Sequence, residues 1–182
     1  MQLALELKRV RKTFGTTVAV EGMDLAVPRG ALYGVIGPNG AGKTTCIRMI
    51  MSILFPDSGE LSVLGQRSAL EAKDRIGYLP EERGVYRKMK VGAFLTYMAQ
   101  LKGLAGDDAA SRVPRLLQEV GLPDVESKRC EDLSKGMLQR VQFLGAIIHQ
   151  PDLLILDEPF SGQDPVSVRI LRDQILKEHR RG

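Results

Sequence analysis

The sequence has 182 residues, of which 43% are hydrophobic and 26% are charged, so a wholly disordered chain is excluded and about one domain is expected. Its 26 lysines and arginines exceed its 22 aspartates and glutamates, but the interspersed net charge of +4 is only weak evidence for nucleic acid binding. Cys46 and Cys130 are the only cysteines, which excludes a disulfide scaffold or a zinc ribbon and suits a reducing cytoplasm.

The first part of the chain predicts strands and one helix around a glycine-rich turn. Residues 3–10 and 18–27 lie on either side of a Lys-Thr-Phe-Gly turn and predict two strands of a mostly antiparallel sheet. Residues 32–36 form a short, mostly apolar run, which is typical of a buried parallel strand. Residues 43–54 have apolar side chains at helical spacing, and Pro56 prevents that helix from continuing. Further short strands are expected at 60–64 and 75–79.

The middle of the chain predicts helices that interrupt this α/β pattern. Apolar residues mark one helical face over 91–101, and 111–120 is expected to be helical with Pro114 in its first turn. A third amphipathic helix is expected at 135–150. We therefore predict a helical subdomain, at about 86–150, inserted into an α/β core.

The last part of the chain predicts one strand and one helix. Leu153 to Leu156 is the longest unbroken apolar run, far shorter than the roughly 18 residues that a membrane helix requires. Asp164 and Pro165 are typical of a helix N-cap and first position, and basic residues follow near 177–181. Because the first residues are charged and include no apolar segment, no secretory signal is expected.

The strongest chemical signal is the pattern GxxxxGK[ST] between the strand expected at 32–36 and the helix after it. Its glycines allow the backbone to form a concave loop whose N–H groups face phosphates, and the helix N-terminus adds a favourable dipole. Lys43 is expected to reach the β- and γ-phosphates, and the Thr44 hydroxyl is expected to bind Mg²⁺. A threonine-capped glycine turn is the alternative. The residues are Gly37, Pro38, Asn39, Gly40, Ala41, Gly42, Lys43, Thr44 and Thr45.

Two carboxylates, Asp157 and Glu158, directly follow the apolar strand. A strand that ends in acidic residues delivers negative charge to the sheet edge where the glycine-rich loop also opens. We expect Asp157 to hold Mg²⁺ through a water, and Glu158 to orient or deprotonate a water. The alternative is a simple acidic turn before Pro159.

A third pattern, Leu133 to Met137, precedes an amphipathic helix, and Ser134 is explained by helix capping alone. Together, however, the three patterns resemble the ATP-binding cassette (ABC) ATPases over nearly the whole chain. The matching segments are 37–45 for the Walker A motif, 133–137 for the signature motif, 153–158 for Walker B with its catalytic glutamate, and 161–165, which includes Asp164, for the D-loop.

The resemblance implies a P-loop NTPase (RecA-like) α/β core with an antiparallel β subdomain and the inserted helical subdomain. Residues 1–182 would form a single ABC ATPase domain that is incomplete at its C-terminal end, since the family's switch histidine follows the last helix. His149 is expected to be a surface residue at a helix end, and His179 to complement a helix dipole, so neither matches that histidine. We also expect uncovered apolar surface near Val168, Leu171 and Ile175.

The resemblance also implies ATP hydrolysis with Mg²⁺, which powers export of a substrate through a partner membrane permease. The protein would be cytoplasmic and held by that permease at the inner face of the cell membrane, and no nucleic acid partner is expected. Two ATPase chains would form a head-to-tail dimer, in which Ser134 and the N–H of Gly136 donate to the γ-phosphate bound by the other chain. Phe14 would stack on adenine, a contact worth ~1–3 kcal/mol, unless it is a core residue.

This sequence differs from the usual family pattern at three positions. Glu81 stands where a glutamine is usual and would ligate a water or Mg²⁺, which makes it a second catalytic candidate. Lys135 and Met137 replace a glycine and a glutamine of the signature motif. These replacements are similar to those of bacterial sodium or drug exporters whose cassette is a separate polypeptide.

Other functions remain open. A non-transport ABC ATPase that acts on nucleic acid would insert a long coiled coil between Glu81 and Ser134, where this chain has a compact helical segment. A nucleotide-binding module with little turnover would fit the missing histidine, whereas a simple P-loop kinase would need no signature motif.

The segment 81–90, which includes Arg83 and Tyr86, is expected either to dock the permease or to be a solvated basic loop.

Overall fold

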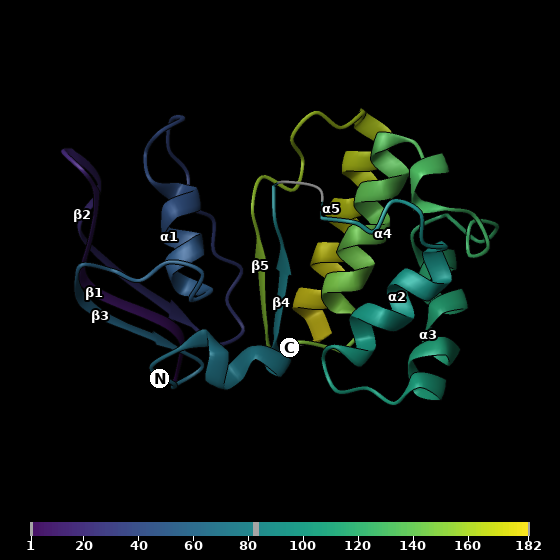
Figure 1. Ribbon diagram of the computed structural model, residues 1–182, viewed down its shortest axis with the longest axis horizontal. Coiled ribbons are helices and arrows are strands. Elements are labelled where there is room, and N and C mark those ends of the chain that lie inside the picture. Colours follow the sequence, from purple (N-terminus) through teal and green to yellow (C-terminus); the bar gives the residue numbers. More distant parts are fainter. Residues whose placement is uncertain (1, 82–83, 182) are drawn as a thin grey trace. The chain divides into compact units, whose positions relative to one another are not determined.

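The computed structural model describes residues 2–81 and 84–181 and divides into two compact units, Met1–Lys73 and Asp74–Gly182 (Figure 1). The first unit contains the strands β1 (Leu3–Phe14), β2 (Thr17–Pro28) and β3 (Ser58–Val63) and the helix α1 (Lys43–Ile50). The second unit contains β4 (Ile76–Leu79), β5 (Leu153–Leu156), α2 (Val91–Gln100), α3 (Gly106–Glu119), α4 (Lys135–Ile147) and α5 (Pro165–Arg181). Short 3-10 helices form at Ala69–Arg75 and Cys130–Asp132.

An antiparallel sheet of order β2-β1-β3 forms the base of the first unit, which confirms the predicted antiparallel pair. The strand β1 extends to Phe14, beyond its predicted end, because Phe14 still pairs with Thr17 across the hairpin. α1 contacts this sheet and buries Cys46, whose Sγ atom lies 3.2 Å from the Sδ atom of Met23 on β2.

α1 ends at Ile50 rather than at the predicted Leu54. Ser52 adopts the left-handed conformation, with φ of 56°, that commonly ends helices. The amide of Ile53 then donates to the carbonyl of Arg48 at 2.9 Å and closes the helix end.

The prediction of a buried parallel strand at 32–36 is wrong for this structure. Residues 31–38 are irregular, and Leu32, Val35 and Ile36 are exposed, Ile36 by 96%. A parallel strand requires a neighbour that runs in the same direction. The strands of the first unit pair only with one another, in antiparallel register, so this apolar run has no ladder to join within its unit.

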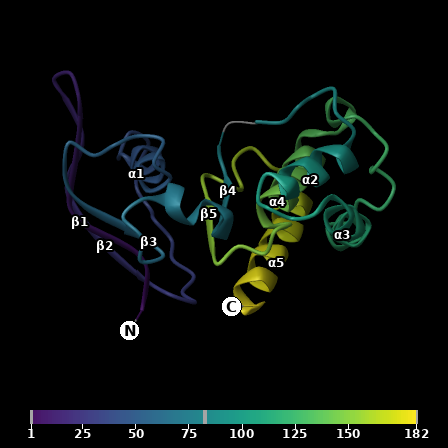
Figure 2. The same cartoon turned by 60° about the horizontal axis from the view of Figure 1, so that its bottom comes forward.

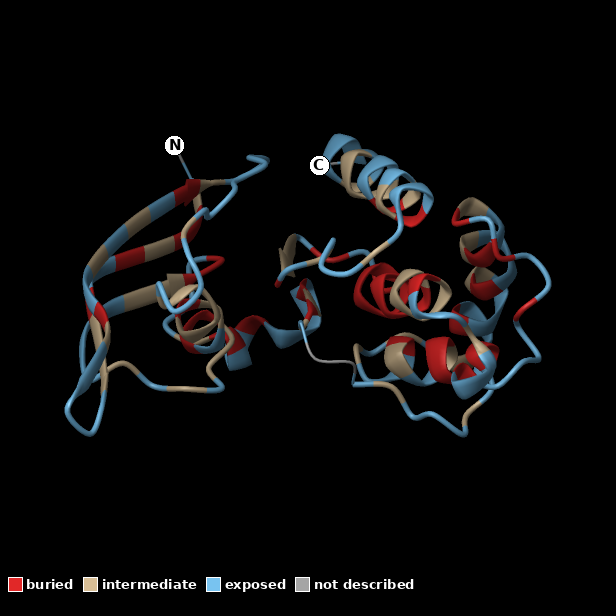
Figure 3. Cartoon of the chain, turned by 90° about the horizontal axis from the view of Figure 1, so that it is seen from above, coloured by how far each residue is buried: buried red, intermediate tan, exposed pale blue. Residues whose placement is uncertain are grey.

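The second unit is built around a parallel pair of strands, with Ile76 opposite Leu153 and Leu79 opposite Leu156. Parallel neighbours require a crossover connection, and here α2, α3 and α4 all lie between β4 and β5 in the chain. Residues 141–149 are buried without interruption, and α4 contacts α2, α3, α5 and β4 (Figures 2 and 3). α4 is therefore the central helix of the core.

α3 begins at Gly106, five residues before the predicted start at Ser111, so Pro114 lies inside the helix rather than in its first turn. Proline removes the donor to the carbonyl four residues earlier. Both Pro114 and Ala110 are exposed, where water can replace that donor. Gly121 ends this helical segment with φ of 70°, as predicted.

The expectation of uncovered apolar surface on the last helix is wrong at Leu171, which is only 2% exposed. Leu171 belongs to the core of the second unit, and Ile175 packs against that core, while Val168 is half-buried. Contacts with α3 hold α5 in place, because Gln174 Nε2 donates to the carbonyl of Glu119 at 2.9 Å and Lys177 pairs with the Glu119 carboxylate at 2.8 Å.

In the part of the chain that the structure describes, no helix combines the length and the apolar character that crossing a bilayer requires.

We expect Gly77→Ala to destabilise the protein, because β4 touches α4 at this glycine. A Cβ atom at Gly77 would collide with the carbonyl oxygen of Ala146 and lie 3.0 Å from both Leu154 Cδ1 and Pro151 Cγ. Overpacking of this kind costs about 1–3 kcal/mol, which should lower the thermal midpoint by several degrees in circular dichroism melts. Gly145→Ala in α4 is the control, since its Cβ would have only ordinary contacts, at 3.4 Å or more. Equal midpoints for both variants and the parent would contradict the close packing.

Candidate functional site

The glycine-rich loop 37–42 joins the irregular segment to α1 through two left-handed glycines. Gly40 has φ of 81° and Gly42 has φ of 82°, conformations that side chains other than glycine's rarely adopt. Gly42 is also the N-cap of α1 and contributes no side-chain cap to the helix. The first-turn amides therefore point out of a helix N-terminus, where the backbone attracts anions.

A close backbone approach holds this helix end on β2. A Cβ atom at Gly42 would collide with the carbonyl oxygen of Ala19 and lie 3.1 Å from Val20 Cγ2. Glycine is thus required at this position by both conformation and space.

Lys43 is folded over the loop that precedes it. Its Nζ atom donates to the carbonyl oxygens of Gly37 at 2.8 Å and Pro38 at 3.1 Å. Asn39, Gly40 and Ala41 are exposed at the loop tip, whereas Thr44 and Thr45 are half-buried in the first turn of α1. The ammonium group is therefore held at the mouth of the loop, within reach of an anion bound there.

Phe14 lies at the hairpin end of β1 in the same unit, and its side chain is 49% exposed. The hairpin joins it to β2, which contacts Gly42 through Ala19. Phe14 and the residues that Gly42 approaches, Ala19 and Val20, thus lie on the same hairpin. A half-exposed ring is available for stacking and is not a core residue.

The second unit carries the acidic residues at the carboxyl ends of its parallel strands. Asp157 is only 3% exposed, and its amide donates to the carbonyl of Leu79 at 2.9 Å, which extends the β4–β5 ladder. Glu158 leaves the ladder with φ of 47° and is exposed. Glu81 is also exposed and follows β4 at the same edge, because β4 and β5 run parallel.

The signature-like segment meets the D-loop-like segment within the second unit. Ser134 caps α4, since its Oγ atom accepts a hydrogen bond from Met137 N at 3.3 Å. Gly136 is buried, and a Cβ there would collide with Ser167 Oγ and lie 3.2 Å from the Asp164 carboxylate. The N-termini of α4 and α5 are therefore in contact.

Asp164 caps α5, as the sequence predicts. Its Oδ1 atom accepts hydrogen bonds from Val166 N at 3.0 Å and Ser167 N at 2.9 Å. The hydrogen bonds from Ser167 hold the pKa of this carboxyl below its usual range. An ionised carboxylate complements the positive ends of both helices.

Sequence reasoning missed a chain of side-chain amides beside this contact. Gln163 Nε2 donates to Gln139 Oε1, and Gln139 Nε2 donates to the carbonyl oxygen of Pro159. The chain ties the segment after Glu158 to α4. Gln163 lies in the D-loop-like segment and Gln139 lies in no motif, and the sequence does not indicate a contact between residues 24 positions apart.

The predicted site residues divide between the units. Phe14 and residues 37–45 lie in the first unit, and Glu81, Ser134, Gly136, Asp157, Glu158 and Asp164 lie in the second. Over residues 2–81 and 84–181, no group of three or more His, Cys, Asp or Glu side chains could hold a metal ion.

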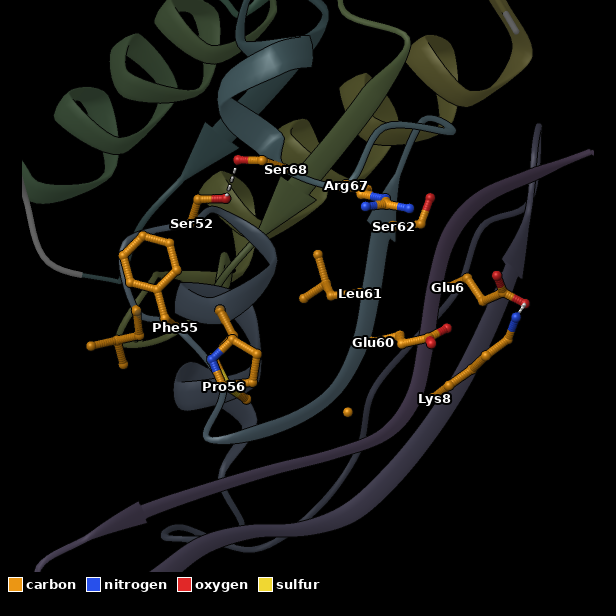
Figure 4. A pocket seen from close by; sticks show the side chains of 13 residues that line it. Glu6, Lys8, Ser52, Phe55, Pro56, Glu60, Leu61, Ser62, Arg67 and Ser68 are labelled. Carbon is orange, nitrogen blue, oxygen red and sulfur yellow. Dashed lines mark hydrogen bonds and ion pairs between the residues drawn. The ribbon is translucent and has the colours of Figure 1, made fainter.

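A cavity of about 570 Å³ lies in the first unit between β1, β3 and the loop after α1 (Figure 4). Glu6, Lys8, Phe55, Glu60 and Arg67 are among its lining residues. It includes none of the residues that the motifs single out. The cavity is therefore separate from the candidate site.

A sequence profile of the ABC transporter family matches residues 20–161. The chain belongs to the ABC transporter family. It is 46% identical over 172 residues to the uncharacterized ABC transporter ATP-binding protein YhaQ of Bacillus subtilis, with 94% of this chain and 58% of that protein covered. It is 36% identical over 178 residues to the Nod factor export ATP-binding protein I of Cupriavidus metallidurans, with 96% and 59% covered.

The solved structure of an ATP-binding subunit of an ABC transporter matches with a TM-score of 0.87 and 31% identity, covering all of this chain and 76% of that one. The predicted family and fold class, a P-loop NTPase of the ABC type with an antiparallel β subdomain and helical segments, are thereby confirmed. The chain spans less than two thirds of the length of the two curated relatives named above.

His149 is buried, contrary to the expectation of a surface residue, and only 9% of it is exposed. The residues before it, 147–148, are also buried at the end of α4. The imidazole ring of His149 reaches the start of β4, where its Nε2 atom lies 3.2 Å from the carbonyl oxygen of Ile76. Lys102 Nζ donates to the same carbonyl at 2.9 Å. Burial, and then the charge of Lys102, lowers the pKa of His149 to about 4.

We expect His149 to make stability depend on pH between about 6.5 and 4. The folded-state pKa lies below the ordinary value, so the unfolded chain binds a proton first, and the free energy of unfolding falls as the pH falls. The full shift corresponds to about 3 kcal/mol. Urea unfolding of His149→Gln should show a flatter dependence on pH over this range than the parent. His179→Gln, on the exposed end of α5, is the control, and equal flattening in both variants would contradict a role for the buried ring.

Proposed function

We propose that the chain binds ATP with Mg²⁺ and hydrolyses ATP to power export of a substrate through a partner membrane permease. The single observation that carries this proposal is the glycine-rich loop. The loop has two left-handed glycines, a helix N-terminus held against β2 and a lysine ammonium at its mouth, and these features would together bind phosphate. The relative from Cupriavidus metallidurans is a Nod factor export ATP-binding protein, which supports the export direction.

The loop residues would bind the phosphates. The amides of Gly37 to Thr45, including those of Asn39, Gly40, Ala41 and Gly42, would donate to phosphate oxygens around the turn at Pro38. Lys43 would exchange the carbonyls of Gly37 and Pro38 for the β- and γ-phosphates. Phe14 would stack on the adenine ring.

The residues present fit an Mg²⁺ ion held mainly by phosphates and water. Mg²⁺ keeps several waters and usually binds only one or two protein carboxylates together with substrate phosphates. The Thr44 hydroxyl, the buried Asp157 carboxylate and, through a water, Glu81 would hold it. The ion would neutralise charge on the β- and γ-phosphates.

Glu158 would orient the attacking water and accept its proton. The water oxygen forms a bond to the γ-phosphorus while the bond to the β–γ bridging oxygen breaks, which releases ADP and phosphate. The exposed position of Glu158 at the strand end suits proton exchange with solvent. Glu81, at the same sheet edge, is the second candidate for this role.

A second ABC ATPase chain would bind against the contact between α4 and α5. Ser134 and the Gly136 amide would donate to the γ-phosphate in the other chain, and Asp164 holds the neighbouring turn. By the symmetry of such a dimer, the partner's signature residues would in turn lie on this chain's ATP. We propose the head-to-tail dimer as the unit that hydrolyses ATP.

The permease would dock on the segment 81–90 and hold the protein at the cytoplasmic face of the membrane. Tyr86 is exposed and contacts Tyr97 edge to face, with centroids 5.5 Å apart, beside the basic Arg87, Lys88 and Lys90. Arg83, also expected here, lies outside the described residues.

An ATPase acting on nucleic acid is disfavoured, because α2 and α3, with 10 and 14 residues, are too short for a long coiled coil.

We expect Lys43→Ala to weaken ATP binding about tenfold or more. The change removes a charge-assisted contact of about 1.5–3 kcal/mol, and ~1.4 kcal/mol is a factor of ten in affinity. Calorimetric titration with Mg-ATP measures the effect. Lys8→Ala is the matched control, since Lys8 pairs with Glu6 on β1, away from the loop. Unchanged affinity in Lys43→Ala would reject the phosphate-binding role.

We expect Glu158→Gln to keep ATP affinity and to lose turnover by about 10²–10⁴-fold, the usual contribution of a positioned general base. ATP-dependent dimers should accumulate, because binding persists without hydrolysis. Phosphate release and light scattering measure the two effects, with Glu81→Gln assayed in parallel. Parent-like turnover in Glu158→Gln, with a loss in Glu81→Gln, would transfer the base role to Glu81.

A further inference from the structure

Asp57 binds the three residues that precede Phe14, two of them through its carboxylate. Its oxygens accept hydrogen bonds from Lys12 Nζ at 2.8 Å, Thr13 N at 2.7 Å and Thr13 Oγ1 at 2.6 Å. Its own amide donates to the carbonyl of Arg11 at 2.9 Å. All of these contacts lie within the first unit.

The Asp57 side chain replaces a backbone hydrogen-bond partner that β3 does not provide to the end of β1. β3 begins at Ser58, which pairs with Arg11, so β1 has no backbone partner on that edge for its last residues. The side chain of Asp57 satisfies the Thr13 amide in place of a ladder carbonyl. The hairpin end that presents Phe14 is thereby held by one carboxylate.

The same carboxylate sets the position of a cation over Phe14. The Lys12 side chain is only 16% exposed, and its Nζ atom lies 5.6 Å from the centroid of the Phe14 ring. The hydrogen bonds from Lys12 and then Thr13 hold the pKa of Asp57 well below its usual range, so this carboxylate stays ionised at neutral pH. A cation within about 6 Å of a ring face is attracted by the ring's electrons.

We propose that Lys12 and Asp57 are positioning residues for adenine recognition: Asp57 anchors Lys12, and Lys12 holds the Phe14 ring by one face. The inference rests on the proposed binding of adenine by Phe14. Because Lys12 lies on one side, the base stacks on the other face of the half-exposed ring. The ammonium draws ring electron density away from the face on which the base stacks, and that face then attracts an electron-rich purine more strongly. Phe14 and Lys12 would therefore recognise the base of the nucleotide and not its phosphate chain.

The test compares Mg-ATP with Mg-tripolyphosphate, which has the phosphates but no base. Calorimetric affinities are measured for the parent, Asp57→Asn, Lys12→Met, Lys12→Arg and Phe14→Leu, with Lys8→Met as the control on the same strand. Lys12→Met keeps the apolar part of the side chain and removes its charge. It therefore still tests the role of the cation if Asp57→Asn lowers the thermal midpoint of the protein. Lys12→Arg restores a cation.

We expect Asp57→Asn and Lys12→Met to lower ATP affinity by roughly two- to fivefold, the range of an exposed cation–π contact, and to leave tripolyphosphate affinity unchanged. Lys12→Arg should recover most of the ATP affinity. Adding Lys12→Met to Phe14→Leu should cost nothing further, because the two residues act as one unit.

Equal losses for ATP and tripolyphosphate would overturn the inference, since the residues would then act through the phosphate loop or the fold. Unchanged ATP affinity in Asp57→Asn and Lys12→Met, with a loss in Phe14→Leu, would also overturn it while leaving the proposed function intact. Unchanged ATP affinity in Phe14→Leu would reject the adenine contact of the proposed function, and this inference with it.

Discussion

The close approach of Gly42 to the carbonyl of Ala19 is the constraint on which the first unit depends. It fixes the N-terminus of α1 against β2, and no larger residue fits there. Because β2 returns through the hairpin to Phe14, the same contact relates the phosphate loop to the aromatic ring. The loop conformation and the position of the helix N-terminus therefore both depend on one glycine.

The second unit depends on a comparable approach at Gly136, where two helix N-termini meet. Two positive helix ends would repel each other without a compensating charge. Asp164 supplies that charge while capping α5, and the chain from Gln163 to Gln139 to Pro159 links the turn to the residues after β5. A small residue at 136 and a carboxylate at 164 are thus physically coupled, although the motifs that contain them are far apart in the sequence.

Local patterns predicted most elements, because apolar periodicity and turn residues act over a few positions. The hairpin, the helix faces and the cap at Asp164 follow from them. The segment 32–36 was predicted wrongly because an apolar run fixes neither a strand partner nor its direction. The site residues were selected by motif and resemblance, and their roles stay predictions. The contacts of Asp57 with Thr13 and of Gln163 with Gln139 could not be predicted, because they join segments 44 and 24 positions apart through ordinary polar side chains.

The two adjacent carboxylates after β5 show how one residue of backbone separates two chemical roles. Asp157 is still in the ladder and is almost fully buried, whereas Glu158 turns out of it into solvent with a positive φ. A buried carboxylate is stable as an anion only beside cations or hydrogen-bond donors, which suits coordination of a metal. An exposed carboxylate can take a proton and return it to water. A left-handed conformation in a residue other than glycine is costly, and such strain tends to occur where function requires it. The backbone turn between Asp157 and Glu158 thus leaves the first carboxylate buried and the second in solvent, which are the environments that their proposed roles require.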